Sequence, residues 1–133
     1  MIDIEDEVFT RVQTAVIAEY PNALIVGKET RAPSKFPCVS IMEMDNAVLE
    51  RTQDSDSQEN HAVLMYEVNV YSNKSKGSKA ECKAIFAIVD SALSIMGFSR
   101  IMKNPVSLDD ATKYRIVGRY SGVAGTDNHI YRR

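Results

Sequence analysis

The sequence predicts an α+β fold: a largely antiparallel (mixed) sheet of four to five strands, with two helices packed on one face and a long hairpin loop. Two segments have apolar residues at helical spacing, and a run of strict alternation between them is typical of a strand. The predicted strands follow one another without helical crossovers, which favours antiparallel pairing. The 133 residues fit a single domain, residues 1–133, that can bury one core without disulfides.

The first helix is predicted over residues 3–19, where apolar side chains recur three and four positions apart and acids occupy the first turn. The apolar residues are Ile4, Val8, Phe9, Val12, Ala15 and Val16. The sequence YPN at 20–22 ends this helix. A short buried strand at 23–26, an extended loop at 30–37 and a second strand that begins at Cys38 are expected to follow.

A polar segment separates the second predicted strand from the third. Residues 46–60 contain no apolar residue from Arg51 to Asn60, which is long for a hairpin connection, and such loops are usually functional or disordered. In the next run, HAVLMYEVNVYS, alternate residues point to opposite faces. The face expected to be buried holds Ala62, Leu64, Tyr66, Val68 and Val70. The two strands should therefore form a hairpin with a long arm.

The second helix is expected to begin at Ser78, which fits a capping box with Glu81, and to end at Gly97. Its predicted apolar stripe, facing the core, consists of Ala80, Ala84, Ile85, Ile88, Ala92, Ile95 and Met96. Short extended pieces then flank Pro105. A strand at about 114–123, a turn at GTDN and a short last strand complete the predicted fold.

The loop before the second helix, SNKSKGSKAE, is basic and contains a glycine, as a phosphate-binding loop would. Such a loop needs several glycines, and the Walker pattern also requires GKS or GKT at the helix start. This loop has one glycine, Gly77, and lacks that pattern. We interpret it as a solvated basic turn rather than a phosphate site.

The sequence predicts no metal, no cofactor and no catalytic residues. Two pairs of acids, which do not continue into a calcium-binding pattern, are Asp54 with Asp56 and Asp109 with Asp110. The histidines, His61 and His129, have no nucleophile placed beside them by the pattern. Cys38 and Cys82 lack metal-ligand spacing, and we interpret both as free thiols in a reducing compartment. We therefore expect a protein that is not an enzyme.

The net charge of −2 predicts no strong overall attraction to nucleic acid or membrane, but the charges are unevenly distributed. The acids of the N-terminus include Asp3, Glu5 and Asp6, and no apolar run that would form a signal peptide or a spanning helix follows them. The basic residues near the C-terminus are Lys113, Arg115, Arg119, Arg132 and Arg133. We expect a soluble protein made in a cytoplasm, with one acidic and one basic surface.

The alternation in the C-terminal strand predicts which face its basic residues occupy. Tyr114, Ile116, Gly118 and Tyr120 share one face, while Lys113, Arg115, Val117 and Arg119 share the other. The aromatic residues should pack inward and the arginines should face outward. Arginine enrichment is typical of protein interfaces as well as of nucleic-acid sites. The pattern favours a protein interface over direct DNA contact, and a small nucleic-acid-binding module stays an alternative.

The runs VNVYSN, GSKAECKAIFAIVDSAL, MGFSR and YRIVGRYSGV with the terminal IYRR resemble the tail terminator proteins of tailed bacteriophages, also called tail completion, head-to-tail joining or minor capsid proteins. The resemblance spans most of the chain and is strongest from Tyr66 onward. It implies a hexameric ring that caps the head-proximal end of the tail tube, without catalytic residues or cofactors. It also implies localisation to the virion tail or neck after assembly in the bacterial cytoplasm.

The resemblance further implies partners and sites. The partners are other copies of the chain, the tail tube protein and a neck or head-completion (stopper) protein, while DNA passes through the ring without specific binding and no membrane is involved. By position, the hairpin loop that contacts the tube or a partner comprises Arg51, Thr52, Gln53, Asp54, Ser55, Asp56, Ser57 and Gln58. A ring needs two complementary flanks. The acidic start of the first helix and the basic C-terminus could supply them. Another head-to-tail connector, a stopper or adaptor, is the alternative within the same assembly.

Overall fold

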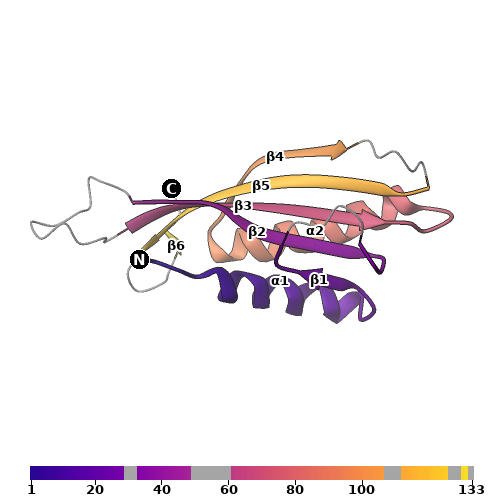
Figure 1. Cartoon of the computed structure of the whole chain (residues 1–133), viewed down its shortest axis with the longest axis horizontal. Helices are drawn as coiled ribbons and strands as arrows, with labels where there is room; N and C mark the ends of the chain where they lie inside the picture. Colours follow the sequence, from indigo (N-terminus) through magenta and orange to yellow (C-terminus); the bar gives the residue numbers. More distant parts are fainter. Residues whose placement is uncertain (29–32, 49–60, 107–111, 126–129, 132–133) are drawn as a thin grey trace, which may run out of the picture.

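The computed structural model describes residues 1–28, 33–48, 61–106, 112–125 and 130–131. A twisted sheet forms one layer, and two helices lie against one of its faces (Figure 1). In chain order, the elements are α1 (Glu5–Glu19), β1 (Leu24–Val26), β2 (Cys38–Val48), β3 (His61–Ser72), α2 (Ser78–Met96), β4 (Ser99–Val106), β5 (Tyr114–Gly125) and β6 (Ile130–Tyr131). The predicted α+β class is confirmed.

The strands of the sheet lie in the order β1-β2-β3-β5-β4, and β6 pairs with the end of β5 beyond the stretch that pairs with β4. β1 is parallel to β2 and every other pair is antiparallel, so the sheet is mixed as predicted. The expectation of two short pieces around Pro105 was wrong, because β4 is one strand through Pro105. Proline lacks a backbone N–H but is tolerated there because β4 is an edge strand.

The β2–β3 hairpin is confirmed, and it is longer than predicted. Its ladder extends to Val48 opposite Ala62, so residues 46–48, which were assigned to the loop, belong to the strand. The predicted contact loop, Arg51 to Gln58, lies outside the described residues. A register shift between Glu43 and Asp45 marks a β-bulge in β2.

The core lies between the sheet and the helices. The alternation predicted for β3 is confirmed, since its five inward side chains are fully buried. From α1, the buried side chains Val8, Val12 and Val16 form a stripe at four-residue spacing. One aromatic contact spans the core: the ring centroids of Tyr66 and Phe98 lie 5.4 Å apart in an edge-to-face arrangement.

The predicted burial of α2 was partly wrong. Its buried residues are Cys82, Ile85, Phe86, Val89 and Leu93, whereas Ala80, Ala84 and Ile95 are exposed. This helix is apolar around most of its circumference, so spacing alone does not fix which face turns inward. The face that turns inward carries Ile85, Phe86 and Leu93, which bury more apolar area than the alanines of the other faces would.

The ends of α2 show one error and one success of prediction. Ser78 makes no capping hydrogen bond, because the helix begins after Gly77, whose φ is 86°. Glu81 instead accepts a hydrogen bond from the hydroxyl of Ser72 at 2.7 Å. At the other end Gly97, with φ 110°, ends the helix as predicted, and Phe98 N–H donates to the Leu93 carbonyl at 3.0 Å.

Candidate interaction surfaces

The bare face of the sheet, opposite the helices, carries the arginines of β5. As predicted, Ile116 and Tyr120 are buried on the helix side. Arg115 donates from Nε and Nη2 to Oδ1 of Asn69 at 2.9 and 2.7 Å. Nε of Arg119 lies 3.2 Å from Oε1 of Glu67. Both arginines therefore bridge β5 to β3 within the chain.

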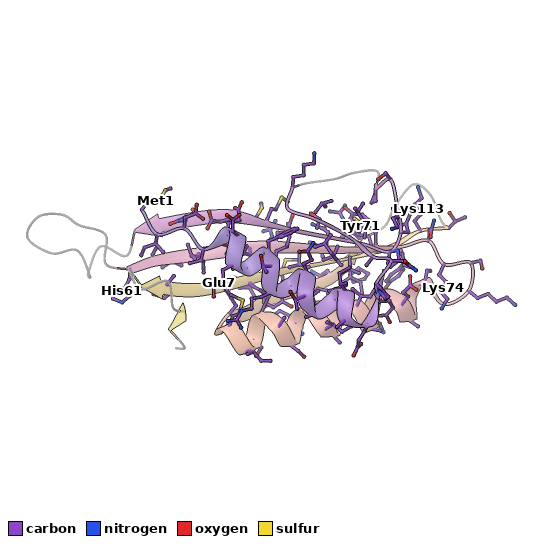
Figure 2. All side chains as sticks on the ribbon, turned by 90° about the horizontal axis from the view of Figure 1, so that it is seen from below. Met1, Glu7, His61, Tyr71, Lys74 and Lys113 are labelled. Atoms are coloured by element: carbon purple, nitrogen blue, oxygen red, sulfur yellow. The ribbon has the colours of Figure 1, made fainter. Side chains whose placement is uncertain are left out.

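The basic surface lies at one end of the elongated molecule (Figure 2). Figure 2 shows Lys113, Lys74 and Tyr71 at this end, while Met1 and His61 lie at the other. The ammonium of Lys113 lies 5.3 Å from the centre of the Phe36 ring. The turn before α2 and the first turns of α2 add exposed lysines: Lys74, Lys76, Lys79 and Lys83. Two other predicted basic interface residues, Arg132 and Arg133, lie outside the described part of the chain.

The acidic surface forms where α1 begins. Asp3, Glu5 and Asp6 are all exposed there, as predicted. The charges of Asp3 and Glu5 also reach Glu43 on β2, a residue that the sequence analysis missed. Burial is the main cause that raises the pKa of Glu43, and the charges of Glu5 and Asp3 raise it further. A hydrogen bond of 3.3 Å from the Tyr66 hydroxyl lowers the pKa of Glu43.

The alternation of residues in β2 contains a signal from which the partial burial of Glu43 could have been predicted. Glu43 is in phase with Val39 and Ile41, both of which are buried. An acid in phase with buried residues is expected to be partly desolvated. A pocket of about 240 Å³ opens beside this strand, with Glu5, Asp6 and Tyr66 among its lining residues.

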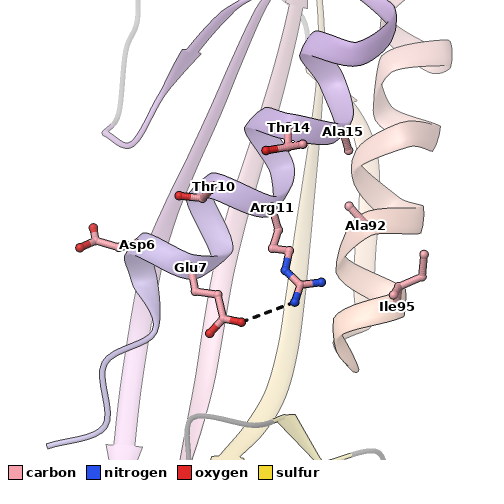
Figure 3. Close-up of a pocket in the computed structure, with 8 residues that line it drawn as sticks. All are labelled: Asp6, Glu7, Thr10, Arg11, Thr14, Ala15, Ala92 and Ile95. Carbon is pink, nitrogen blue, oxygen red and sulfur yellow. Dashed lines mark ion pairs between the residues drawn. The ribbon is translucent and has the colours of Figure 1, made fainter.

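A second cavity lies between the two helices (Figure 3). It has a volume of about 670 Å³. Its lining residues are Asp6, Glu7, Thr10, Arg11, Thr14, Ala15, Ala92 and Ile95. Glu7 and Arg11 form an exposed ion pair of 3.8 Å at its rim. Ile95, which was predicted to be buried, is 73% exposed.

The two cysteines are free and buried. Burial raises the pKa of the Cys38 thiol to about 11 and that of Cys82 to about 12. The Sγ atom of Cys82 lies 3.4 Å from the Tyr114 carbonyl oxygen, which can accept its weak hydrogen bond. Both groups are therefore protonated at neutral pH and poor nucleophiles.

Within the described ranges, no group of three or more histidine, cysteine, aspartate or glutamate residues could hold a metal ion. The acidic pairs at 54/56 and 109/110, and His129, lie outside those ranges. The described helices include none that is long and apolar enough to cross a membrane.

Comparison with known proteins identifies a shared fold. No protein-family model matches the sequence. No curated protein matches it either. Among solved structures, the fold is similar to a chain from the virion of a native gene transfer agent particle. The two chains are 16% identical and have a TM-score of 0.63, and the match covers 89% of this chain and 91% of the other. At this identity the similarity shows the fold.

Proposed function

We propose that this protein is a structural protein of a phage-like virion, and more specifically a tail terminator. In this role it forms a ring on the head-proximal end of the tail tube, ends tube polymerisation and joins the tail to the neck. The observation that carries the proposal is the fold match, which covers about nine tenths of both chains and involves a component of a virion particle. The sequence resemblance to tail terminators points independently to the same kind of assembly.

The distribution of charge is compatible with a ring. The acids at the start of α1 and the lysines of the basic end lie in different places on one copy (Figure 2). A contact between two different surfaces of identical chains is heterologous, and it closes into a ring when its rotation divides the circle evenly. The proposed ring is a homo-hexamer.

The proposed role is mechanical rather than catalytic. It requires surfaces for the tail tube protein and for the neck protein, and it requires no cofactor. The loop at 51–58 is the proposed contact with the tube or another partner. DNA passes through the ring without specific binding, which fits a chain whose net charge is −2.

Capping of isolated tail tubes tests this function. Purified protein is mixed with tubes that lack the native terminator, and the fraction of tube ends that carry a ring is counted by electron microscopy. We expect rings at one end only and no further growth when free tube protein is added. A variant without residues 51–60, with unchanged circular dichroism, is expected to lose capping. Normal capping by this variant would remove the loop from the mechanism.

The same experiment separates the other connector roles. A stopper or adaptor would bind the portal side and leave tube ends bare. For the nucleic-acid alternative, affinity for duplex DNA that falls steeply with salt is the expected signature. Arg115 and Arg119 are already held by Asn69 and Glu67. We therefore expect only weak binding, and unchanged binding after both are replaced by glutamine.

A further inference from the structure

Two β-bulges lie at the same height along the strands, one near each edge of the sheet. The β2 bulge follows Glu43, and the β4 bulge follows Arg100. Glu43 pairs with Tyr66, Tyr66 with Tyr120, and Tyr120 with Arg100, so one row across the sheet joins both bulges.

Each bulge presents a large apolar side chain to solvent. Met44 is 46% exposed in the β2 bulge, and Ile101 is 54% exposed in the β4 bulge. In the described part of the chain, the exposed large hydrophobic residues are these two, Met1 and Ile95. A bulge redirects side chains out of the regular pleat. The sheet therefore carries one apolar projection on each flank.

Within the residues that the structure describes, both flanks are open strand edges. β1 pairs only with residues 38–40 of β2, and no described strand pairs with residues 41–48 on that side. Among the described strands, β4 is the last on its side of the sheet and pairs with β5 alone. Open edges invite association with another chain, and bulges and charges restrict which partner fits.

The two edges have opposite charge. Glu43 and Asp45 flank Met44, and Asp3 and Glu5 lie close enough to raise the pKa of Glu43. On the other flank, Arg100 and Lys103 enclose the bulge. Arg100 is 49% exposed although it pairs with Asp90 at 3.3 Å, and the exposed Lys103 lies over the Phe86 ring. We call these surfaces the acidic β2 edge (Asp3, Glu5, Glu43, Met44, Asp45) and the basic β4 edge (Arg100, Ile101, Lys103).

We propose that the acidic β2 edge of one copy docks on the basic β4 edge of the next copy, with Met44 against Ile101. This inference rests on the proposed ring and names the contact that builds it. If neighbouring copies are related by rotation about an axis parallel to the strands, the row that joins the two bulges stays at the same height in every copy. The β2 bulge of one copy then meets the β4 bulge of the next at every interface. Charge complementarity selects this partner over a second identical edge, where like charges would repel.

The acidic pocket beside β2 adds a site for a basic side chain of the neighbour. It lies next to Ile41 and is lined by Glu5 and Asp6. A lysine or arginine from the β4 edge of the neighbour would bring a cation to this group of carboxylates. The basic flank of the interface is therefore β4, not the strand that carries Arg115 and Arg119.

Disulfide trapping tests the contact directly. A Met44→Cys/Ile101→Cys chain is oxidised on tail tubes and, separately, at high concentration in solution. We expect a ladder of cross-linked species that ends at the closed ring. The native Cys38 and Cys82 are fully buried and should not compete. A control chain with Met44→Cys and Ala80→Cys, which places the second thiol on exposed helix surface, is expected to stay uncross-linked.

The outcomes distinguish the interface from the function. Capped tubes without the cross-link would overturn this interface and leave the terminator role intact. A cross-linked ladder in solution from a protein that does not cap tubes would retain the interface and overturn the role. If no cross-link forms and the tubes stay uncapped, both the interface and the terminator role are overturned.

Charge exchange provides a second test. The variants Asp3→Lys/Glu5→Lys/Asp45→Lys and Arg100→Glu/Lys103→Glu each make the two edges alike in sign, so each alone should lose association in native mass spectrometry. Mixed in equal amounts they should assemble in alternation, because every interface again joins opposite charges. Lys74→Glu/Lys76→Glu, a matched charge change in the turn before α2, should assemble normally. Association by either edge variant alone, or failure of two folded variants to associate when mixed, would contradict the proposal.

Discussion

At the scale of single residues, Gly118 shows how tightly α2 packs on β5. A Cβ atom at this position would lie 2.5 Å from Cζ of Phe86 and 2.7 Å from Cε2 of the same ring. Real Cβ atoms do not approach other carbon atoms so closely. Gly118 therefore leaves room for the Phe86 ring. A glycine in a strand often marks a site of close approach, and here the approaching group is a side chain.

We predict that Gly118→Ala destabilises the protein by about 1–3 kcal/mol, because the Phe86 ring must shift out of a well-packed position. Gly27→Ala is the matched control, since its nearest neighbour, Cδ2 of Phe9, would be 3.5 Å away in ordinary contact. Urea unfolding measures both changes. Equal midpoints for the two variants would show that the ring moves freely.

Glu43 makes stability depend on pH. Its folded pKa is raised by burial and by the charges of Glu5 and Asp3. The folded state therefore holds the proton more tightly than the unfolded state does, so this group adds stability as pH falls through the folded pKa toward the unfolded value. At neutral pH its charged form opposes folding.

Glu43→Gln is accordingly expected to stabilise the isolated protein at pH 7, and the gain should disappear below the unfolded pKa of about 4.3. Urea midpoints measured for both proteins at pH 7 and pH 4 test this. A gain of equal size at both pH values would rule out the charge as its cause.

At the scale of elements, Asp90 joins a helix to two strands. It accepts a hydrogen bond of 2.6 Å from the Tyr120 hydroxyl on β5 and pairs with Arg100 on β4 at 3.3 Å. Because the Asp90 side chain is 34% exposed, water can replace part of a lost interaction. The group fixes α2 over the edge of the sheet that carries the β4 bulge.

Tyr120→Phe should lower stability by about 1–2 kcal/mol, near the lower end for a hydrogen bond to a charged group. A double-mutant cycle with Asp90→Asn isolates the interaction. Additive losses would mean that this hydrogen bond contributes nothing of its own.

The elements also show what the sequence could predict. The alternation in β3 and the spacing of Val8, Val12 and Val16 identified buried faces correctly, because each of these patterns has one apolar side. The pattern of α2 has apolar residues on several sides. For this reason the exposure of Ala84 and Ile95 became visible only when the helix was packed against the sheet.

The candidate sites were predicted less completely than the fold. Sequence position correctly put Arg115 and Arg119 on the outward face. It could not show that Asn69 and Glu67 would hold them, because these contacts depend on the register between β3 and β5. The bulges at Met44 and Ile101 were missed for a similar reason, since a single extra residue in a strand leaves no distinct sequence signal.

At the scale of the whole molecule, the chain is an elongated two-layer domain with different surfaces on its two flanks (Figure 1). The acidic β2 edge and the basic β4 edge bound the same sheet on opposite sides. Such a molecule is suited to heterologous contacts between copies. Lys74, in the turn before α2, lies at one end of the long axis (Figure 2).

The measurement that tests the terminator role most directly is electron microscopy of particles from the source genetic element after deletion of this gene. We expect overlong or headless tails, and their restoration to one length, joined to heads, when the protein is supplied from a plasmid. Particles that are normally joined and normal in length without the gene would contradict the terminator role.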